Sequence, residues 1–188
     1  MRIISGNFKG KKILLPKDKL TRPLKDLTKE SIFNIIKHSK LLDIEIENSN
    51  ILDLFSGIGS FGLECLSRGA ASVTFLESYK EVLIVLKKNI DNLKQQNYSN
   101  IIEKDIFAEK TLKLLNNKFE IIFMDPPYKE KKLAVLLNTI IQLKLLKDNG
   151  IIIIHRHKKE EDIFPNKFNI VLKKNYGISK IIFGNTLV

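Results

Sequence analysis

The chain has 188 residues, which suits a single domain, and 44% of them are apolar, enough to form a hydrophobic core. No window approaches the roughly 18 uninterrupted apolar residues of a membrane span, and the N-terminus lacks the apolar stretch of a signal peptide. We therefore expect a cytoplasmic protein with no membrane partner. The single cysteine, Cys65, excludes an intramolecular disulfide and is typical of a reducing compartment. Cys65 and the three histidines show no spacing typical of metal ligands, so we expect no metal.

Positive charge is concentrated near the N-terminus. The formal net charge is +11, and residues 1–40 hold eleven Lys and Arg residues against three Asp and Glu residues. This gives the segment a net charge of +8 and leaves +3 for the other 148 residues. A basic flank on a nearly balanced domain favours a polyanionic partner such as nucleic acid. The alternative is general lysine enrichment, since Lys, Ile and Asn are abundant throughout the chain.

The N-terminal pattern predicts a small basic appendage, residues 1–45, in front of a larger domain, residues 46–188. Residues 2–16 predict two short strands about a Gly/Asn turn, a β-hairpin. Residues 21–39 predict a helix, because Pro23 stands near its first position and apolar residues follow at helical spacing.

From residue 50 onward, strand and helix patterns alternate. Predicted strands cover residues 50–55, 72–77, 100–105, 119–125 and 150–156, and predicted helices cover 59–69, 79–96, 108–117 and 129–146. Two last strands, 168–177 and 178–184, meet at a tight turn at Gly177 with no helix between them. The alternation predicts an α/β fold with a mostly parallel, seven-stranded sheet and helices on both faces. The closing hairpin predicts an antiparallel strand at its end.

Acidic residues mark the ends of the predicted strands. In open sheets of this kind, ligands bind at the carboxyl ends of the strands. Asp53, Glu77, Asp105 and Asp125 each lie at or next to such an end. We therefore expect the chemistry at this edge of the sheet.

A glycine-rich loop follows the first of these strands. Gly57-x-Gly59-x-x-Gly62 opens a predicted helix, which is typical of a nucleotide-binding loop. Gly57 allows the tight turn, Gly59 lets a ligand approach the backbone, and Gly62 permits close packing of the helix. A plain strand–helix turn is the alternative.

Two ligands fit this loop, a dinucleotide and S-adenosylmethionine. Glu77 can accept hydrogen bonds from both hydroxyls of a ribose. Asp53 lies inside the strand before the glycines, where it would repel a pyrophosphate but suits the ammonium group of a methionine moiety. Asp105 could accept a hydrogen bond from the adenine amino group, although an ordinary acid at a strand end explains it equally well.

The most distinctive segment is Asp125-Pro126-Pro127-Tyr128. Each proline fixes its own φ and pushes the preceding residue to an extended conformation, which makes a stiff loop. The Asp125 carboxylate and the Pro126 carbonyl can then converge on one point, and Tyr128 supplies a flat face for stacking. The alternative is a rigid turn with a satisfied aspartate.

Such a loop suits an exocyclic base amine as the target. The lone pair of that nitrogen is delocalised into the ring, and two acceptors on its N–H groups favour a more pyramidal nitrogen whose lone pair points at a sulfonium methyl group. Positioning of this kind contributes up to roughly 7–11 kcal/mol in well-oriented systems. No metal, strong base or covalent nucleophile is required, but a base locked in structure must be turned out to reach the site.

Together these motifs resemble the class I S-adenosylmethionine-dependent methyltransferases with a Rossmann-like fold, and Asp/Asn-Pro-Pro-Tyr/Phe is the signature of amino-group methylators. More closely, the chain resembles the bacterial RsmD family, which methylates guanine N2 at one site in small-subunit ribosomal RNA. The similarity runs nearly end to end, through "RIISGNFKGKKI", "TRPLKDLTKESIFNII", "DLFSGIGSFGLECLSRGA", "MDPPY" and "YGISKIIF". The departures are Leu24, Ile58, Ser60-Phe61 and "ESYKE"; Leu24 stands where the family usually has Thr, which leaves the local role of the Arg22 segment open.

The resemblance implies three groups of site residues. The expected contacts to S-adenosylmethionine are Asp53, Phe55, Ser56, Gly57, Gly59, Gly62, Glu77, Asp105 and Ile106. In the expected catalytic group, Asp125, Pro126, Pro127 and Tyr128, the first two hold the guanine amine and the tyrosine stacks on the base. The expected RNA-binding residues are Arg2, Lys9, Lys11, Lys12 and Arg22. The implied partner is small-subunit ribosomal RNA within an assembled or assembling subunit, and a monomeric chain is favoured.

Three other functions compete with this interpretation. An adenine-N6 methyltransferase on DNA or another RNA would use the same Pro-Pro loop, although the chain has no room for a separate DNA-recognition domain. An oxidoreductase with a dinucleotide conflicts with Asp53, and a non-catalytic RNA-binding assembly module conflicts with the intact loop at Asp125. Residues 155–162, "HRHKKEED", are interpreted as a solvated loop rather than an RNA contact.

Overall fold

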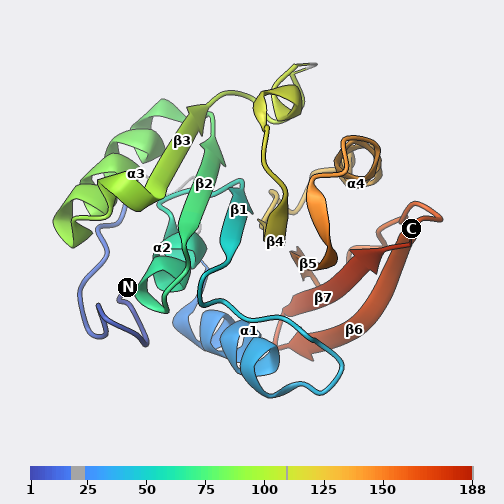
Figure 1. Cartoon of the computed structure of the whole chain (residues 1–188), viewed down its shortest axis with the longest axis horizontal. Helices are drawn as coiled ribbons and strands as arrows, with labels where there is room; N and C mark the ends of the chain where they lie inside the picture. Colours follow the sequence, from blue (N-terminus) through green and yellow to red (C-terminus); the bar gives the residue numbers. More distant parts are fainter. Residues whose placement is uncertain (18–23, 109, 188) are drawn as a thin grey trace.

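The computed structural model of the chain describes residues 1–17, 24–108 and 110–187. These residues form a seven-stranded sheet in the order β3-β2-β1-β4-β5-β7-β6 (Figure 1). The strands are β1 Asn50–Leu54, β2 Ser72–Glu77, β3 Ser99–Glu103, β4 Phe119–Met124, β5 Leu146–His157, β6 Phe168–Tyr176 and β7 Ser179–Thr186. The first five pair in parallel, and β7 runs antiparallel to both β5 and β6. The predicted mostly parallel sheet with its antiparallel C-terminal strand is confirmed.

Helices cover both faces of this sheet, as predicted. They are α1 Asp26–His38, α2 Ser60–Ser67, α3 Lys80–Leu93 and α4 Leu133–Gln142, with short 3₁₀ turns η1 Gln96–Tyr98 and η2 Leu112–Leu114. Side chains alternate along a strand, so each strand serves two cores. Ile51 and Phe123 pack with α1, α2 and α3, whereas Leu52, Leu54 and Met124 pack with α4.

The order of the strands places a crevice between β1 and β4. The chain builds outward from β1 to β3 and then returns to the other side of β1 to form β4. Ligands of open α/β sheets bind at such a switch point, beyond the carboxyl ends of the strands. Asp53 on β1 and Asp125 directly after β4 therefore share one site.

A stack of three phenylalanines holds β4 against the helices. The ring centroids of Phe61 on α2 and Phe123 on β4 lie 4.0 Å apart, and those of Phe33 on α1 and Phe61 lie 5.2 Å apart. Both pairs are stacked, and aromatic pairs contribute about 0.5–1.5 kcal/mol beyond their buried area. The stack fixes α1, α2 and β4 together directly beneath the crevice.

The N-terminal hairpin differs from the prediction. Its ladder contains one isolated antiparallel bridge, Arg2 to Lys12, rather than two regular strands. The reason is that part of its backbone binds α2 instead of the opposite arm. The N–H groups of Ile4 and Ser5 donate to the two carboxylate oxygens of Glu64 at 2.8 and 2.9 Å.

Glu64 is also the centre of a buried ionic cluster. Its carboxylate lies 3.5 Å from the Lys29 ammonium group of α1 and 2.9 Å from the Arg68 guanidinium group. The side chains of Glu64 and Lys29 are fully buried. Ile3 and Ile13 lie in the same hydrophobic cluster as the helices on this face. The N-terminal segment thus packs onto the sheet domain, and the division into residues 1–45 and 46–188 stays a prediction.

Three predicted elements differ from the observed ones in type or in bounds. The helix predicted over residues 108–117 is wrong, because the described residues of this range form only the 3₁₀ turn η2; so short a segment is a marginal helix. The helix predicted over residues 129–146 is shorter, since Lys144 takes a left-handed conformation (φ 52°) just after α4. The third strand stops at Glu103, two residues before Asp105. The predicted helix start at Pro23 lies outside the described residues.

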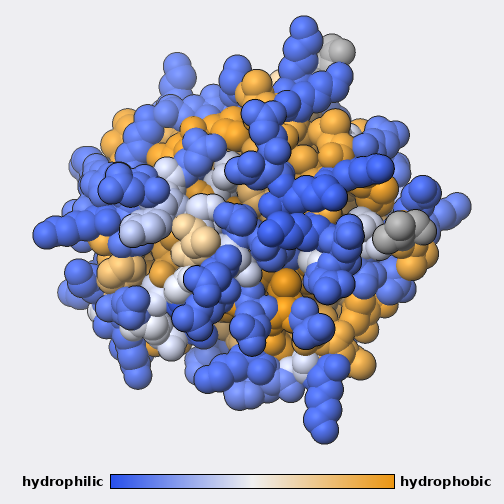
Figure 2. All heavy atoms as spheres, in the orientation of Figure 1, coloured by the Kyte–Doolittle hydropathy of each residue, from blue (hydrophilic) through white to orange (hydrophobic). Residues whose placement is uncertain are grey.

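In the view of Figure 2, hydrophilic side chains cover most of the visible surface, with apolar patches between them. None of the helices in the described ranges combines the length and the apolar character needed to cross a membrane.

Candidate active site

A cavity of about 730 Å³ lies at the carboxyl ends of the central strands. Eleven predicted site residues line it: Asp53, Phe55, Ser56, Gly57, Glu77, Asp105, Ile106, Asp125, Pro126, Pro127 and Tyr128. Residues from β1, from β2 and from the segment after β4, far apart in the sequence, thus meet at one place. Leu24, Lys25 and Thr28 at the start of α1 also line it.

The other two predicted cofactor residues, Gly59 and Gly62, do not line the cavity but shape its wall. Gly59 has φ 81° at the N-cap of α2, and a Cβ atom there would lie 2.5 Å from Leu86 Cδ1. A Cβ atom on Gly62 would lie 2.4 Å from the Phe75 ring. The glycine at position 62 therefore lets α2 pack closely on β2, as the sequence predicts.

Backbone N–H groups hold the Glu77 carboxylate at the cavity wall. One oxygen accepts from Gly57 at 2.9 Å, and the other accepts from Ser78 and Tyr79 at 2.8 and 2.9 Å. The carboxylate thereby fixes the glycine loop to the end of β2.

Asp53 is the buried acid of the site. Its residue is 1% exposed, and its carboxylate accepts a hydrogen bond from the Gly62 N–H at 3.0 Å. Burial, opposed by the Gly62 hydrogen bond and assisted by the charges of Asp125 and Glu77, raises the pKa of Asp53 to about 8. In the ligand-free protein at neutral pH, most Asp53 carboxyl groups are therefore protonated.

The part of the cavity that follows β3 combines an acid with apolar side chains. Asp105 is exposed, and its Oδ1 accepts from the Phe107 N–H at 2.9 Å. The Thr111 hydroxyl donates to the Asp105 carbonyl at 2.7 Å. Phe55 and Phe107 lie with ring centroids 6.0 Å apart and, with the buried Ile106, form apolar walls that suit a planar ring.

The segment after β4, residues 125–130, is called the catalytic loop below. Asp125 Oδ1 lies 2.7 Å from His155 Nδ1, and His155 Nε2 lies 2.9 Å from Ser179 Oγ. The Pro126 carbonyl receives no hydrogen bond from the described part of the chain. The Tyr128 ring is half-buried and lies edge-on to His157, with centroids 5.2 Å apart.

Sequence reasoning assigned no role in the site to four residues found here. His155 and Ser179 line the cavity behind Asp125, and Ser60 carries a buried hydroxyl oxygen without a partner among the described residues. Arg156 contacts the catalytic loop from behind. The predicted solvated loop over residues 155–162 is therefore wrong at its start, because His155 and Arg156 are buried at the end of β5. One signal was available, because His155 and Arg156 follow the apolar run of β5 at the edge where the other site residues stand.

The four predicted RNA-binding residues that the structure describes do not line the cavity. Arg2, Lys9, Lys11 and Lys12 are exposed, and none lines it. Arg22 lies outside the described residues. Within residues 1–17, 24–108 and 110–187, no group of three or more His, Cys, Asp or Glu side chains is placed to hold a metal ion.

The strand order, the antiparallel β7 and the crevice between β1 and β4 define the class I methyltransferase fold. A solved structure from Haemophilus influenzae, described as a "putative methylase", superposes with a TM-score of 0.75 at 31% identity, covering 100% of this chain and 98% of that one.

The family model described as "Conserved hypothetical protein 95" matches residues 1–185, so the chain belongs to that family, the RsmD family. The ribosomal RNA small subunit methyltransferase D of Buchnera aphidicola (subspecies Acyrthosiphon pisum) is 36% identical over 92% of this chain and 86% of that protein. The same-named protein of Haemophilus influenzae is 31% identical over 95% of this chain and 90% of that protein.

Proposed function

We propose that this chain transfers a methyl group from S-adenosylmethionine to the exocyclic N2 amine of a guanine in small-subunit ribosomal RNA. The observation that carries the proposal is the catalytic loop, whose Asp125 and Pro126 line the same cavity as Asp53 and Glu77. Membership of the RsmD family and the names of its relatives support the ribosomal substrate.

The residues of the cavity fit S-adenosylmethionine. Asp53 offers a buried acceptor to an ammonium group, Glu77 offers one to a ribose diol, and the buried Ser60 hydroxyl still lacks a partner among the described residues. Asp105 and the apolar walls beside it suit an adenine ring. When bound, this cofactor supplies an electrophilic methyl group on a sulfonium centre.

The catalytic loop would hold and orient the target base. Asp125 and the Pro126 carbonyl accept hydrogen bonds from the two N–H groups of the amine, which aims its lone pair into the cavity, and Tyr128 provides a face for the base. Cavity residues here need only position the reactants. After transfer, the methylated nitrogen carries an acidic proton, and the Asp125 carboxylate lies next to it as an acceptor.

Two assays test this function. Calorimetry should detect binding of S-adenosylmethionine but not of NAD⁺, and labelled methyl groups should appear in unmodified bacterial small subunits rather than in duplex DNA. Label in DNA adenine would favour the N6 alternative. Cofactor binding without transfer to any nucleic acid would favour the non-catalytic module.

Cofactor binding should release a proton through Asp53. With its pKa raised to about 8 in the free protein, Asp53 is largely protonated at pH 7, and an ammonium partner favours its ionised form. Calorimetry at pH 7 in two buffers of different ionisation enthalpy should therefore show net proton release on cofactor binding. The Asp53→Asn variant is the control, since it should bind more weakly with no such release. Buffer-independent heats in the wild type would contradict this role of Asp53.

Basic residues of the N-terminal segment should strengthen RNA binding. Replacing Lys9, Lys11 and Lys12 with alanine should weaken the binding of small-subunit RNA. Each phosphate contact contributes about 0.7–0.9 to the slope of log K against log salt concentration, so the magnitude of this slope should fall by about 2–3. The matched control is the exposed set Lys88, Lys113 and Lys118, with the same loss of charge. Equal effects of the two triple variants would place the RNA-binding surface elsewhere.

A further inference from the structure

Two consecutive residues at the end of β5, His155 and Arg156, have no role in the function proposed so far. Consecutive side chains of a strand point to opposite faces of the sheet. Both nevertheless reach the catalytic loop, which crosses the end of the sheet between β4 and α4. The loop is therefore held from both faces by adjacent residues of the neighbouring strand.

On the cavity face, His155 holds the side chain of Asp125. A carboxylate can only accept, so His155 Nδ1–H donates to Asp125 Oδ1 over 2.7 Å. The other ring nitrogen lies 2.9 Å from the hydroxyl of Ser179 on β7, which fixes the orientation of the imidazole. His155 is 6% exposed. With Oδ1 occupied in this way, the second oxygen of Asp125 remains for the target amine.

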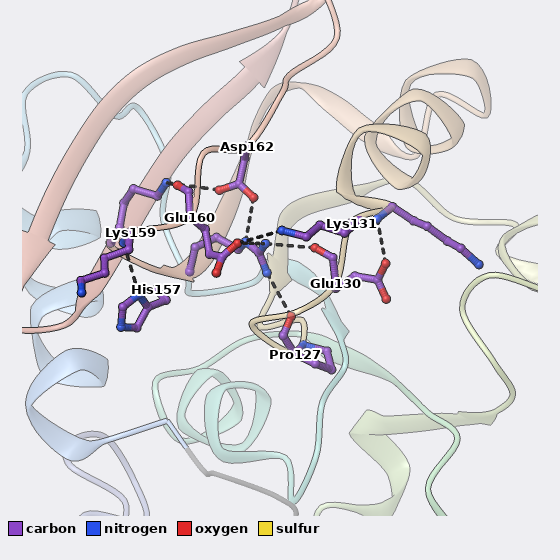
Figure 3. Close-up of polar contacts among 10 residues, drawn as sticks. Pro127, Glu130, Lys131, His157, Lys159, Glu160 and Asp162 are labelled. Atoms are coloured by element: carbon purple, nitrogen blue, oxygen red, sulfur yellow. Dashed lines mark hydrogen bonds and ion pairs between the residues drawn. The ribbon is translucent and has the colours of Figure 1, made fainter.

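On the opposite face, Arg156 holds the backbone of the same loop. Its Nη1 and Nη2 donate to the carbonyl oxygens of Pro127 and Glu130, both at 3.0 Å. Its Nε donates to Asp162 Oδ1 at 2.9 Å. The guanidinium group, with its rigid fork of donors, thus spans the loop at two points three residues apart. Figure 3 shows Pro127 and Glu130 of the catalytic loop facing Glu160 and Asp162 of the segment that follows β5.

Arg156 belongs to a charged cluster with Lys180 and Asp162, in which ionic groups are buried. Lys180 stands directly opposite Arg156 in the β5–β7 ladder, and the two residues are 4% and 1% exposed. Like charges at directly opposite positions destabilise a sheet, and burying ions costs desolvation energy. Asp162 offsets part of this cost, since its second oxygen lies 3.2 Å from the Lys180 ammonium group. Within this arrangement, Arg156 directs its two Nη groups to carbonyls of the catalytic loop.

We propose that His155 and Arg156 are positioning residues, which together set the geometry of the catalytic loop toward the target amine. The proposal rests on the proposed function of Asp125 and Pro126. Neither side chain needs to contact the cofactor, so their loss should affect kcat and leave cofactor affinity intact.

The first test is Arg156→Lys, which keeps the charge but removes the forked donor. Since a misplacement of about 1 Å costs about 100-fold in rate, we expect kcat for methyl transfer to fall by about 10- to 100-fold. The dissociation constant of S-adenosylmethionine should change less than about twofold, because none of the removed contacts reaches a residue proposed to bind the cofactor. In the ligand-free protein, the Glu130 amide, which donates to the Pro127 carbonyl, should exchange its hydrogen faster.

The matched control is Arg68→Lys, the same change at another forked contact. Arg68 donates to Glu64 through Nε at 3.0 Å and Nη2 at 2.9 Å, away from the cavity. This variant should lose thermal stability but keep kcat and the exchange rate of the Glu130 amide. Arg156→Lys with wild-type kcat and wild-type exchange would overturn the role of Arg156.

His155 supplies a second pair of variants, which decides the proposal even if Arg156→Lys does not fold. His155→Leu removes the donor to Asp125 and should lower kcat by about 10- to 100-fold. His155→Asn places an amide N–H near the position of Nδ1 and should restore kcat to within about tenfold of wild type. Full activity of the leucine variant, or equal losses in both, would overturn the donor role. A wild-type chain without transferase activity would instead refute the proposed function, and amide exchange would still test the loop.

Discussion

Asp125→Ala is expected to abolish most methyl transfer while leaving cofactor affinity unchanged within about twofold. The variant removes one of the two acceptors on the target amine, and loss of one preorganised polar group of a reacting centre costs about 100- to 1,000-fold in kcat. The cofactor should bind normally, because its proposed partners are other residues of the cavity. Single-turnover transfer to unmodified small subunits, combined with calorimetry, measures both quantities.

Two further variants sharpen this prediction. Asp125→Asn keeps a carbonyl acceptor in the same place and should retain more activity than the alanine variant. Asp148→Ala removes an exposed acid from the opposite end of β5 and should behave as wild type. A loss of cofactor affinity in Asp125→Ala that matches its loss of kcat would assign Asp125 to cofactor binding instead.

Glu64→Gln is expected to cause the largest loss of stability in the chain. Its carboxylate partners the buried Lys29, the Arg68 guanidinium and two backbone N–H groups of the N-terminal segment. Burial already lowers the pKa of Lys29, and the Glu64 charge opposes that shift. Removing one member of a buried ion pair leaves an uncompensated charge and costs about 3–5 kcal/mol. Equilibrium unfolding in urea measures the change.

An exposed ion pair provides the matched control. Glu103 lies 2.6 Å from the Lys87 ammonium group, and both side chains are 48% exposed. Pairs of this kind contribute about 0–1 kcal/mol, so Glu103→Gln should shift the unfolding free energy by less than about 1 kcal/mol. Equal shifts for the two variants would show that the Glu64 cluster does not anchor α1 and the N-terminal segment.

The layout of the sheet was predictable because it depends on local patterns. Alternating apolar runs and amphipathic segments gave the five parallel strands and the covering helices, and Gly177 marked the closing hairpin. The N-terminal hairpin forms about the Arg2–Lys12 bridge, but its ladder is shorter than predicted because Glu64, about sixty residues away, binds the N–H groups of Ile4 and Ser5. The helix over residues 108–117 was wrong because so short a segment is a marginal helix, and its described residues form a 3₁₀ turn instead.

The site shows the same division between local and distant information. Glycines, acids at strand ends and the Pro-Pro loop are local signals, and the structure brings most of these residues to one cavity. Their binding and catalytic roles stay predictions. The position of His155 and Arg156 at the end of β5 was a weaker signal, because their contacts are with residues about 30 positions earlier in the chain.

The most direct test of the central claim is to identify the methylated nucleoside. Small ribosomal subunits that lack this modification would be incubated with the chain and labelled S-adenosylmethionine, and the RNA would be digested and separated by mass spectrometry. The account predicts label in N2-methylguanosine, and none when Asp125→Ala replaces the wild type. Label in N6-methyladenosine, or no label in a chain that binds the cofactor, would contradict it.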